Sequence, residues 1–84
     1  MSDSSRKRPA RLGQKLATVR ERFGYSLAEM AEKLSNDEAH IYKQDVHRYE
    51  RSERDPSLII LLRYSRLSKV KMEIFADDNL DLPK

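Results

Sequence analysis

Residues 24–34 read GYSLAEMAEKL, and this stretch contains the clearest helix start in the chain. Ser26 and Glu29 have the spacing of a capping box, in which each side chain binds the backbone N–H of the other residue. The apolar residues that follow share one face of a helix: Leu27, Met30, Ala31 and Leu34. We therefore predict an amphipathic helix over residues 27–34 that packs by this face against the rest of a domain.

The segments on both sides also have apolar residues at helical spacing. Upstream, the pattern predicts a helix over residues 10–23 that ends at Gly24, because glycine suits the left-handed position after a helix. Downstream, we predict a helix over residues 42–51 and a buried helix over residues 56–67, with Asp55 as the N-cap of the latter. An apolar cluster near the C-terminus predicts a fifth short helix: Val70, Met72, Ile74 and Phe75. The expected fold class is all-α.

Residues 35–41, with the sequence SNDEAHI, separate two of these helices and allow two structures. In one, Ser35 and Glu38 form a second capping box and start the following helix early. In the other, the segment is a lengthened turn, and Ile41 folds inward as an apolar turn residue. On a helical wheel extended upstream, Ile41 falls near the exposed edge, so the pattern favours the lengthened turn.

The length of 84 residues is enough for one domain. Composition divides it into a flexible basic N-terminal arm (residues 1–9), a helical domain (residues 10–76) and an acidic C-terminal tail (residues 77–84). No apolar run is long enough to predict a membrane span or a signal peptide. We expect a cytoplasmic, nucleoid-associated protein.

Charge is unevenly distributed along the chain. Residues 6–22 contain seven cations and one anion, whereas acidic residues are concentrated in residues 29–38 and 73–84. This segregation fits a basic face that binds a polyanion and fits equally a soluble surface with scattered charge. The chain has no cysteine, and its only histidines, His40 and His47, do not have the pattern of a zinc site. No cofactor is expected. Without a nucleophile–base pair or a glycine-rich phosphate loop, an enzyme is not expected either.

The predicted helix over residues 42–51 has an apolar side and a cationic side. A helix fits the major groove of DNA, where Arg and Lys donate to guanine and Gln pairs with adenine. Two short helices joined by a turn, the second with such a side, form the helix-turn-helix pattern. The pattern is therefore consistent with DNA recognition by this helix, and the alternative is a cationic face that is only solvated.

Three stretches together resemble the Cro/C1-type (Xre family) helix-turn-helix domain: LGQKL at residues 12–16, GYSLAEMA at residues 24–31 and RYERSERDPSL at residues 48–58. The resemblance covers about residues 12–76. It implies a compact five-helix, lambda-repressor-like fold that reads DNA with its third helix. The turn over residues 35–41 is longer than the family pattern, and Leu27 stands where the family often has glutamine.

The resemblance also implies roles for individual residues. Base reading is assigned to the outward side of the third helix: Lys43, Gln44, His47 and Arg48. Phosphate binding is assigned to residues near the ends of the second and third helices, with two cations of the N-terminal segment added: Ser26, Tyr42, Arg51, Arg54, Arg11 and Lys15. Arg20 and Glu50 match a pair that forms a partly buried salt bridge between the first and third helices.

From these features we expect a sequence-specific DNA-binding transcriptional regulator of the repressor type. A homodimer on a palindromic operator is expected, because a single small module reads few base pairs. The alternative is an antitoxin-like or adaptor protein that binds a protein partner through its C-terminal apolar residues: Ile74, Phe75, Leu80 and Leu82. Non-specific binding of RNA or DNA is a third reading of the same basic face.

Overall fold

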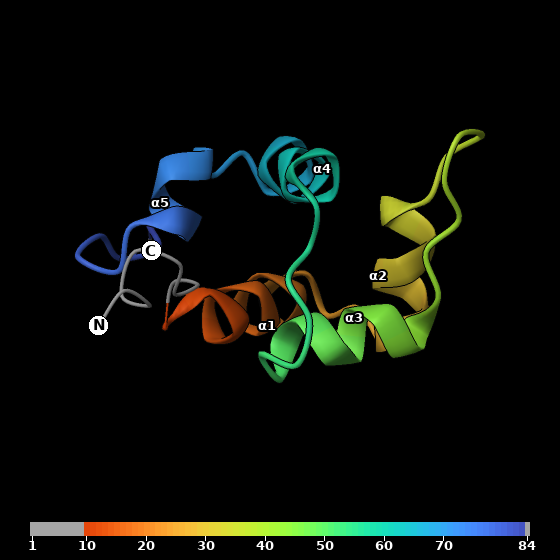
Figure 1. The fold of residues 1–84 in the computed structure, drawn as a ribbon, viewed down its shortest axis with the longest axis horizontal. Helices are drawn as coiled ribbons and strands as arrows, with labels where there is room; N and C mark the ends of the chain where they lie inside the picture. The colour runs from red at the N-terminus through yellow and green to blue at the C-terminus, as the bar shows by residue number, and fades with distance from the viewer. Residues whose placement is uncertain (1–9, 84) are drawn as a thin grey trace, which may run out of the picture.

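The computed structural model describes residues 10–83, which form five helices and no strand (Figure 1). The helices are α1 (Leu12–Phe23), α2 (Leu27–Leu34), α3 (Lys43–Glu50), α4 (Leu58–Ser68) and α5 (Met72–Ala76). The prediction of an all-α fold is confirmed. The predicted basic arm, residues 1–9, lies outside the described residues. No helix in residues 10–83 is long and apolar enough to cross a membrane.

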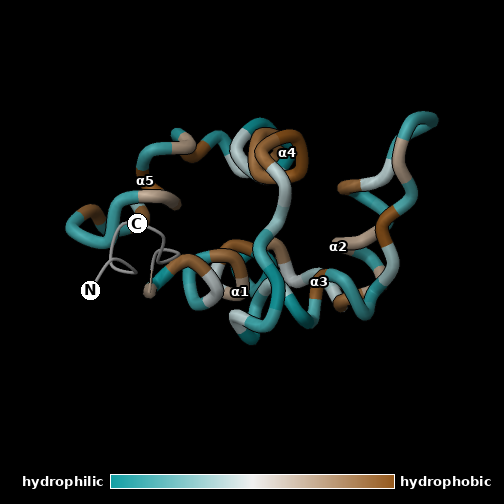
Figure 2. The backbone as a smooth tube through the Cα atoms, in the orientation of Figure 1, coloured by the Kyte–Doolittle hydropathy of each residue, from teal (hydrophilic) through white to brown (hydrophobic). Residues whose placement is uncertain are grey.

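The hydrophobic core receives side chains from every helix and from the loop before α3. Its fully buried members are Leu16 from α1, Met30 and Leu34 from α2, Val46 from α3, Tyr64 from α4 and Phe75 from α5. Burial of one such side chain stabilises the fold by about 1.5–3 kcal/mol. In Figure 2, α4 is largely hydrophobic, whereas α3 is largely hydrophilic. Helix α3 therefore contributes little to the core beyond Val46 and Tyr49.

The predicted turn between α1 and α2 is confirmed in detail. Gly24 has a φ of 74°, and the N–H groups of Gly24 and Tyr25 donate to the carbonyls of Glu21 and Arg20, at 3.0 and 3.2 Å. This is a Schellman motif. Helix α2 then begins with the predicted capping box. Ser26 Oγ accepts the N–H of Glu29 at 3.0 Å, and the Glu29 carboxylate accepts the N–H of Ser26 at 2.7 Å.

The prediction that Asp55 caps α4 and that Pro56 starts it is wrong. Helix α4 begins at Leu58, and Ser57 is its N-cap, with its Oγ accepting the N–H of Ile60 at 3.2 Å. Serine and aspartate are about equally good N-caps, so the sequence offers two starts two residues apart. The structure uses the second, which leaves Pro56 in the connection before the helix.

The acidic C-terminal segment, residues 77–83, packs on α1. Helix α1 has no side-chain N-cap of its own. The Asp78 carboxylate instead accepts the backbone N–H groups of the two residues that precede α1, Ala10 at 2.8 Å and Arg11 at 3.0 Å. The Arg11 guanidinium in turn donates to the carbonyl of Asp78 at 2.7 Å and to the Asp81 carboxylate at 2.6 Å. The C-terminal segment therefore holds the start of α1 and forms an exposed pair with Arg11 through Asp81.

The predicted role of Lys15 in phosphate binding is wrong. Lys15 is only 3% exposed, and its Nζ donates to the carbonyls of Ile74 at 2.6 Å and Asp77 at 2.9 Å. The last carbonyls of a helix lack partners within the helix and carry partial negative charge. The ammonium group of Lys15 satisfies them at the end of α5, so this cation joins α1 to α5 instead of facing solvent.

The C-terminal apolar residues that we predicted as a possible docking surface for a protein partner also pack within the domain. Phe75 is fully buried and makes an edge contact with Tyr64. Ile74 and Leu82 pack against the core, and Leu80 is half-buried. Their apolar surface is thus used within the fold.

The contact between Asp78 and α1 predicts a pH dependence of stability. Hydrogen bonds from the backbone N–H groups of Arg11 and Ala10 hold the pKa of Asp78 below its ordinary value. A carboxyl group with a lowered pKa adds stability that is present above its ordinary pKa and lost as the pH falls through the lowered one. We expect Asp78→Asn to reduce the melting temperature at neutral pH and to flatten its decline between about pH 5 and pH 2.

Circular dichroism melts over this pH range test the prediction. Asp37→Asn, which removes an exposed carboxylate from the loop before α3, is the control and should melt like the unmodified protein. An Asp78→Asn profile that follows the unmodified one at every pH would contradict the stabilising role of Asp78.

Candidate nucleic-acid interface

Helix α3 has one exposed polar face and one buried face. The exposed face contains all four predicted base-reading residues: Lys43, Gln44, His47 and Arg48. On the other side, Val46 is fully buried and Tyr49 is 5% exposed. The predicted division between core and solvent is therefore confirmed for this helix. No apolar side chain interrupts the polar face, so its donors can meet a partner directly.

The start of α3 is held by Asp45. Its carboxylate accepts the N–H of Tyr42 at 2.9 Å, where Tyr42 occupies the N-cap position in extended backbone. The same carboxylate binds Arg54 at 3.2 Å, across the turn that follows the helix. A carboxylate in the first turn also suits the positive end of the helix dipole. Asp45 thus stabilises α3 at its N-terminus and is not part of the exposed donor face.

The predicted pair of Arg20 and Glu50 joins α1 to α3. The guanidinium donates to both carboxylate oxygens, from Nε at 2.7 Å and from Nη2 at 3.1 Å. Its Nη1 donates to the carbonyl of Tyr25 at 2.9 Å. The side chains are 18% and 8% exposed, so water screens the pair only in part. The hydrogen bond to Glu50 is the main cause that raises the pKa of Arg20.

Gly13 allows α1 to approach the end of α3 closely. A side-chain carbon at this position would lie 2.6 Å from the carbonyl oxygen of Glu50 and 2.6 Å from Ser52 Oγ. Real contacts of that length do not occur between a methyl group and backbone oxygen. Gly13 and the Arg20–Glu50 pair therefore act together to fix the angle at which α3 packs against α1.

Three of the predicted phosphate-binding residues lie around α3 on exposed positions. Ser26 is at the N-terminus of α2, where backbone N–H groups and the helix dipole favour an anion. Arg51 and Arg54 follow α3 and are paired with Glu53 at 3.1 Å and Asp45 at 3.2 Å. The Arg51–Glu53 pair is exposed on both sides, and such a pair is worth at most about 1 kcal/mol, so Arg51 can exchange its carboxylate for a phosphate. The guanidinium of Arg54 is also exposed, but its partner Asp45 is partly buried.

The segment before α3 is the lengthened turn and not an early start of the helix. The Asn36 side-chain oxygen accepts the N–H groups of Glu38 and Ala39, each at 2.9 Å, which closes the tip. Glu38 therefore does not form the capping box with Ser35 that was the other possibility. The turn projects beyond α2, at the upper right of Figure 1.

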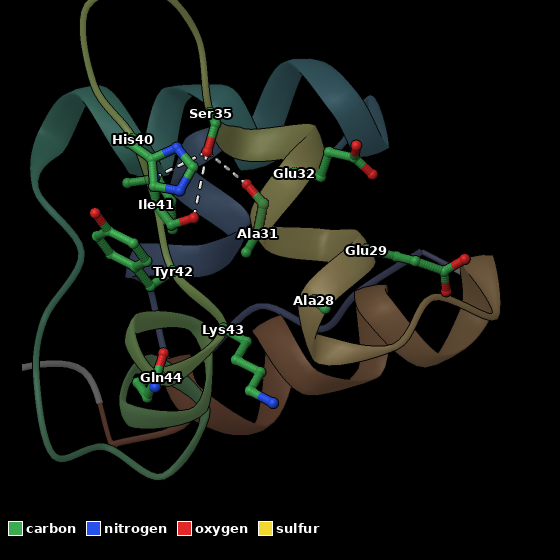
Figure 3. Close-up of a pocket in the computed structure, with 10 residues that line it drawn as sticks. All are labelled: Ala28, Glu29, Ala31, Glu32, Ser35, His40, Ile41, Tyr42, Lys43 and Gln44. Atoms are coloured by element: carbon green, nitrogen blue, oxygen red, sulfur yellow. Dashed lines mark hydrogen bonds between the residues drawn. The ribbon is translucent and has the colours of Figure 1, made fainter.

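Ser35 and Ile41 hold the base of this turn. Ser35 Oγ accepts the N–H of Ile41 at 2.8 Å and donates to the carbonyl of Ala31 at 2.9 Å (Figure 3). Ile41 is 8% exposed and belongs to the core, as predicted for an inward turn residue. The turn is thus fixed at both its tip and its base.

His40 and Tyr42 form a pair of contacting rings on the surface that the sequence did not predict. They flank the buried Ile41 and meet edge to face, with ring centroids 4.4 Å apart. Tyr42 is 60% exposed. Both rings border a groove between α2 and the start of α3, shown in Figure 3. Alternation of an extended chain would have placed both rings outward once Ile41 was placed inward.

Comparison of the chain with known protein families, with curated proteins and with solved structures gave no match.

The Arg20–Glu50 pair predicts a large effect of removing one partner. Glu50→Gln should lower the free energy of unfolding by roughly 2 kcal/mol, because Arg20 would keep its charge without a carboxylate. The double variant Arg20→Met/Glu50→Leu should regain part of this loss, because neither charge is then left unpaired.

Urea unfolding followed by circular dichroism gives both values. Glu21→Gln removes an exposed carboxylate from α1, the helix of Arg20, and should change the free energy of unfolding by less than about 0.5 kcal/mol. The loss of unfolding free energy in the double variant should be smaller than the sum of the losses in its two single variants. A larger loss would contradict the claim that the unpaired charge causes the instability.

Proposed function

We propose that this protein is a sequence-specific DNA-binding transcriptional regulator that inserts α3 into the major groove. The observation that carries the proposal is the exposed face of α3, where four polar side chains point away from the core without an apolar interruption. Lys43 and Arg48 suit guanine O6 and N7, and Gln44 suits adenine N6 and N7. His47 lies between them on the same face.

The surroundings of α3 support this proposal. Helix α2 packs on α3, and α1 packs behind it. The N-terminus of α2 and the guanidinium groups of Arg51 and Arg54 suit the phosphates on either side of the groove. The packing of α1 and α2 against α3 supports our proposal that the chain belongs to the Cro/C1-type family and has its lambda-repressor-like fold.

We propose a homodimer that uses the start of α4 as its interface. Leu58 and Ile59 are 72% and 56% exposed, and both follow the turn that carries Arg54. Two copies joined there would double the few base pairs read by one α3, on half-sites separated by about one helical turn, ~34–36 Å. A dimer bound in this way to a palindromic operator would repress by covering the DNA, in the cytoplasm at the nucleoid.

The central test is selection of bound duplexes from a random DNA library. We expect an enriched palindrome, against which Arg48→Ala loses about 1–3 kcal/mol of binding free energy and loses little on non-specific DNA. Arg66→Ala, which removes an exposed cation from α4, is the matched control and should keep the preference intact. A library without any enriched sequence would reject sequence-specific recognition and favour non-specific nucleic-acid binding.

The proposed dimer interface at Leu58 and Ile59 predicts that a charge placed there changes the number of copies bound to each duplex. Leu58→Glu should bind the selected palindrome as one copy at a time, because a carboxylate on each copy would be buried against the other. Analytical ultracentrifugation with labelled duplex measures the ratio. Unchanged cooperative binding of two copies by Leu58→Glu would place the interface elsewhere.

A further inference from the structure

The groove between α2 and the start of α3 has an apolar floor and a mixed rim. Ala28, Ala31 and Ile41 form the floor (Figure 3). Glu29 and Glu32 stand on the α2 side. The other side is formed by His40, Tyr42, Lys43 and Gln44. The groove is thus continuous with the first turn of the proposed reading helix.

His40 and Tyr42 form what we call the aromatic ledge of this groove. The ledge is rigid, because Ile41 between the two rings is buried and hydrogen-bonded to Ser35 at 2.8 Å. The rings support each other by their edge contact at 4.4 Å. An exposed, ordered aromatic surface can bind an apolar group with little loss of side-chain entropy.

The lining of the groove favours an apolar occupant. Its floor is apolar, and the carboxylate of Glu29 is held at the start of α2 by the N–H of Ser26 at 2.7 Å and points away from the rings (Figure 3). Among neutral groups in the major groove, the 5-methyl group of thymine is the apolar one. If Gln44 reads an adenine, the thymine paired with it presents this methyl group in the same groove.

We propose that the aromatic ledge and the apolar floor bind the methyl group of a thymine at or beside the base pair that Gln44 reads. This inference rests on the proposed function and deepens it. His40 and Tyr42 become specificity-determining residues, and Tyr42 contacts a base instead of the phosphate predicted for it. The lengthened turn carries His40, so it extends the reading surface beyond α3.

The test replaces each thymine of the selected duplex by deoxyuridine, which removes only the methyl group. One position in each half-site should lose binding by about fourfold, the value of burying one small apolar group. Tyr42→Ala and His40→Ala should bind the thymine and uracil duplexes equally at that position. Tyr42→Phe, which keeps the ring, should retain the fourfold preference.

Arg51→Ala is the matched control, because loss of a phosphate contact should weaken binding to both duplexes by the same factor. Circular dichroism melts confirm that each variant is folded. A Tyr42→Ala variant that keeps the thymine preference would overturn the inference, as would a Tyr42→Phe variant that loses it although the ring is kept. Sequence-specific binding without any methyl effect rejects this inference alone, whereas an unenriched library rejects the proposed function with it.

Discussion

The Arg20–Glu50 pair fixes the part of the fold on which the candidate interface depends. One guanidinium binds the carboxylate of α3 and the carbonyl of Tyr25 in the turn before α2, so it joins three elements of the domain. A partly buried charge is stable only when its hydrogen-bonding groups are matched, and here three donors have acceptors at 3.1 Å or less. The geometry of the guanidinium fork therefore determines how α3 is oriented. A lysine could supply the charge but could not donate three hydrogen bonds in the directions fixed by a planar guanidinium.

Internal contacts use much of the positive charge that the sequence concentrates near its N-terminus. Lys15 binds the end of α5, Arg11 binds the C-terminal segment, Arg20 binds Glu50, and Arg22 donates to the carbonyl of Pro83. Within the described residues 10–22, each of the four cations thus makes a contact inside the chain, and Lys15 is buried. The cations that face solvent around α3 come instead from α3 and from the turn after it. Charge segregation predicted that a basic face exists but not which cations form it.

Local signals predicted the fold well because they act over one helical turn. Ser26 and Glu29 are three residues apart, and Gly24 terminates α1 where the apolar pattern stops. The contacts that the sequence did not predict either join residues far apart in the chain or depend on a choice between two equally suitable residues. Asp78 holds the start of a helix that begins more than sixty residues earlier, and no spacing in the sequence links the two. Ser57 and Asp55 are both good N-caps, so only packing of α4 decides between them. For the candidate site, periodicity identified the exposed face of α3, whereas the pairing of His40 with Tyr42 required the path of the turn.

The turn over residues 35–41 shows how a loop can add surface while its backbone is held in place. Loop-closure entropy grows only slowly with length, so a few extra residues destabilise the fold little. Ordering them requires internal contacts, and the side chains of Asn36 and Ser35 supply hydrogen bonds at the tip and the base while Ile41 anchors the chain in the core. The backbone that carries the aromatic rings beside Ile41 is consequently held in place in the free protein. A partner that meets them loses less conformational entropy than one that must order a mobile loop, and this favours affinity at the N-terminal end of α3.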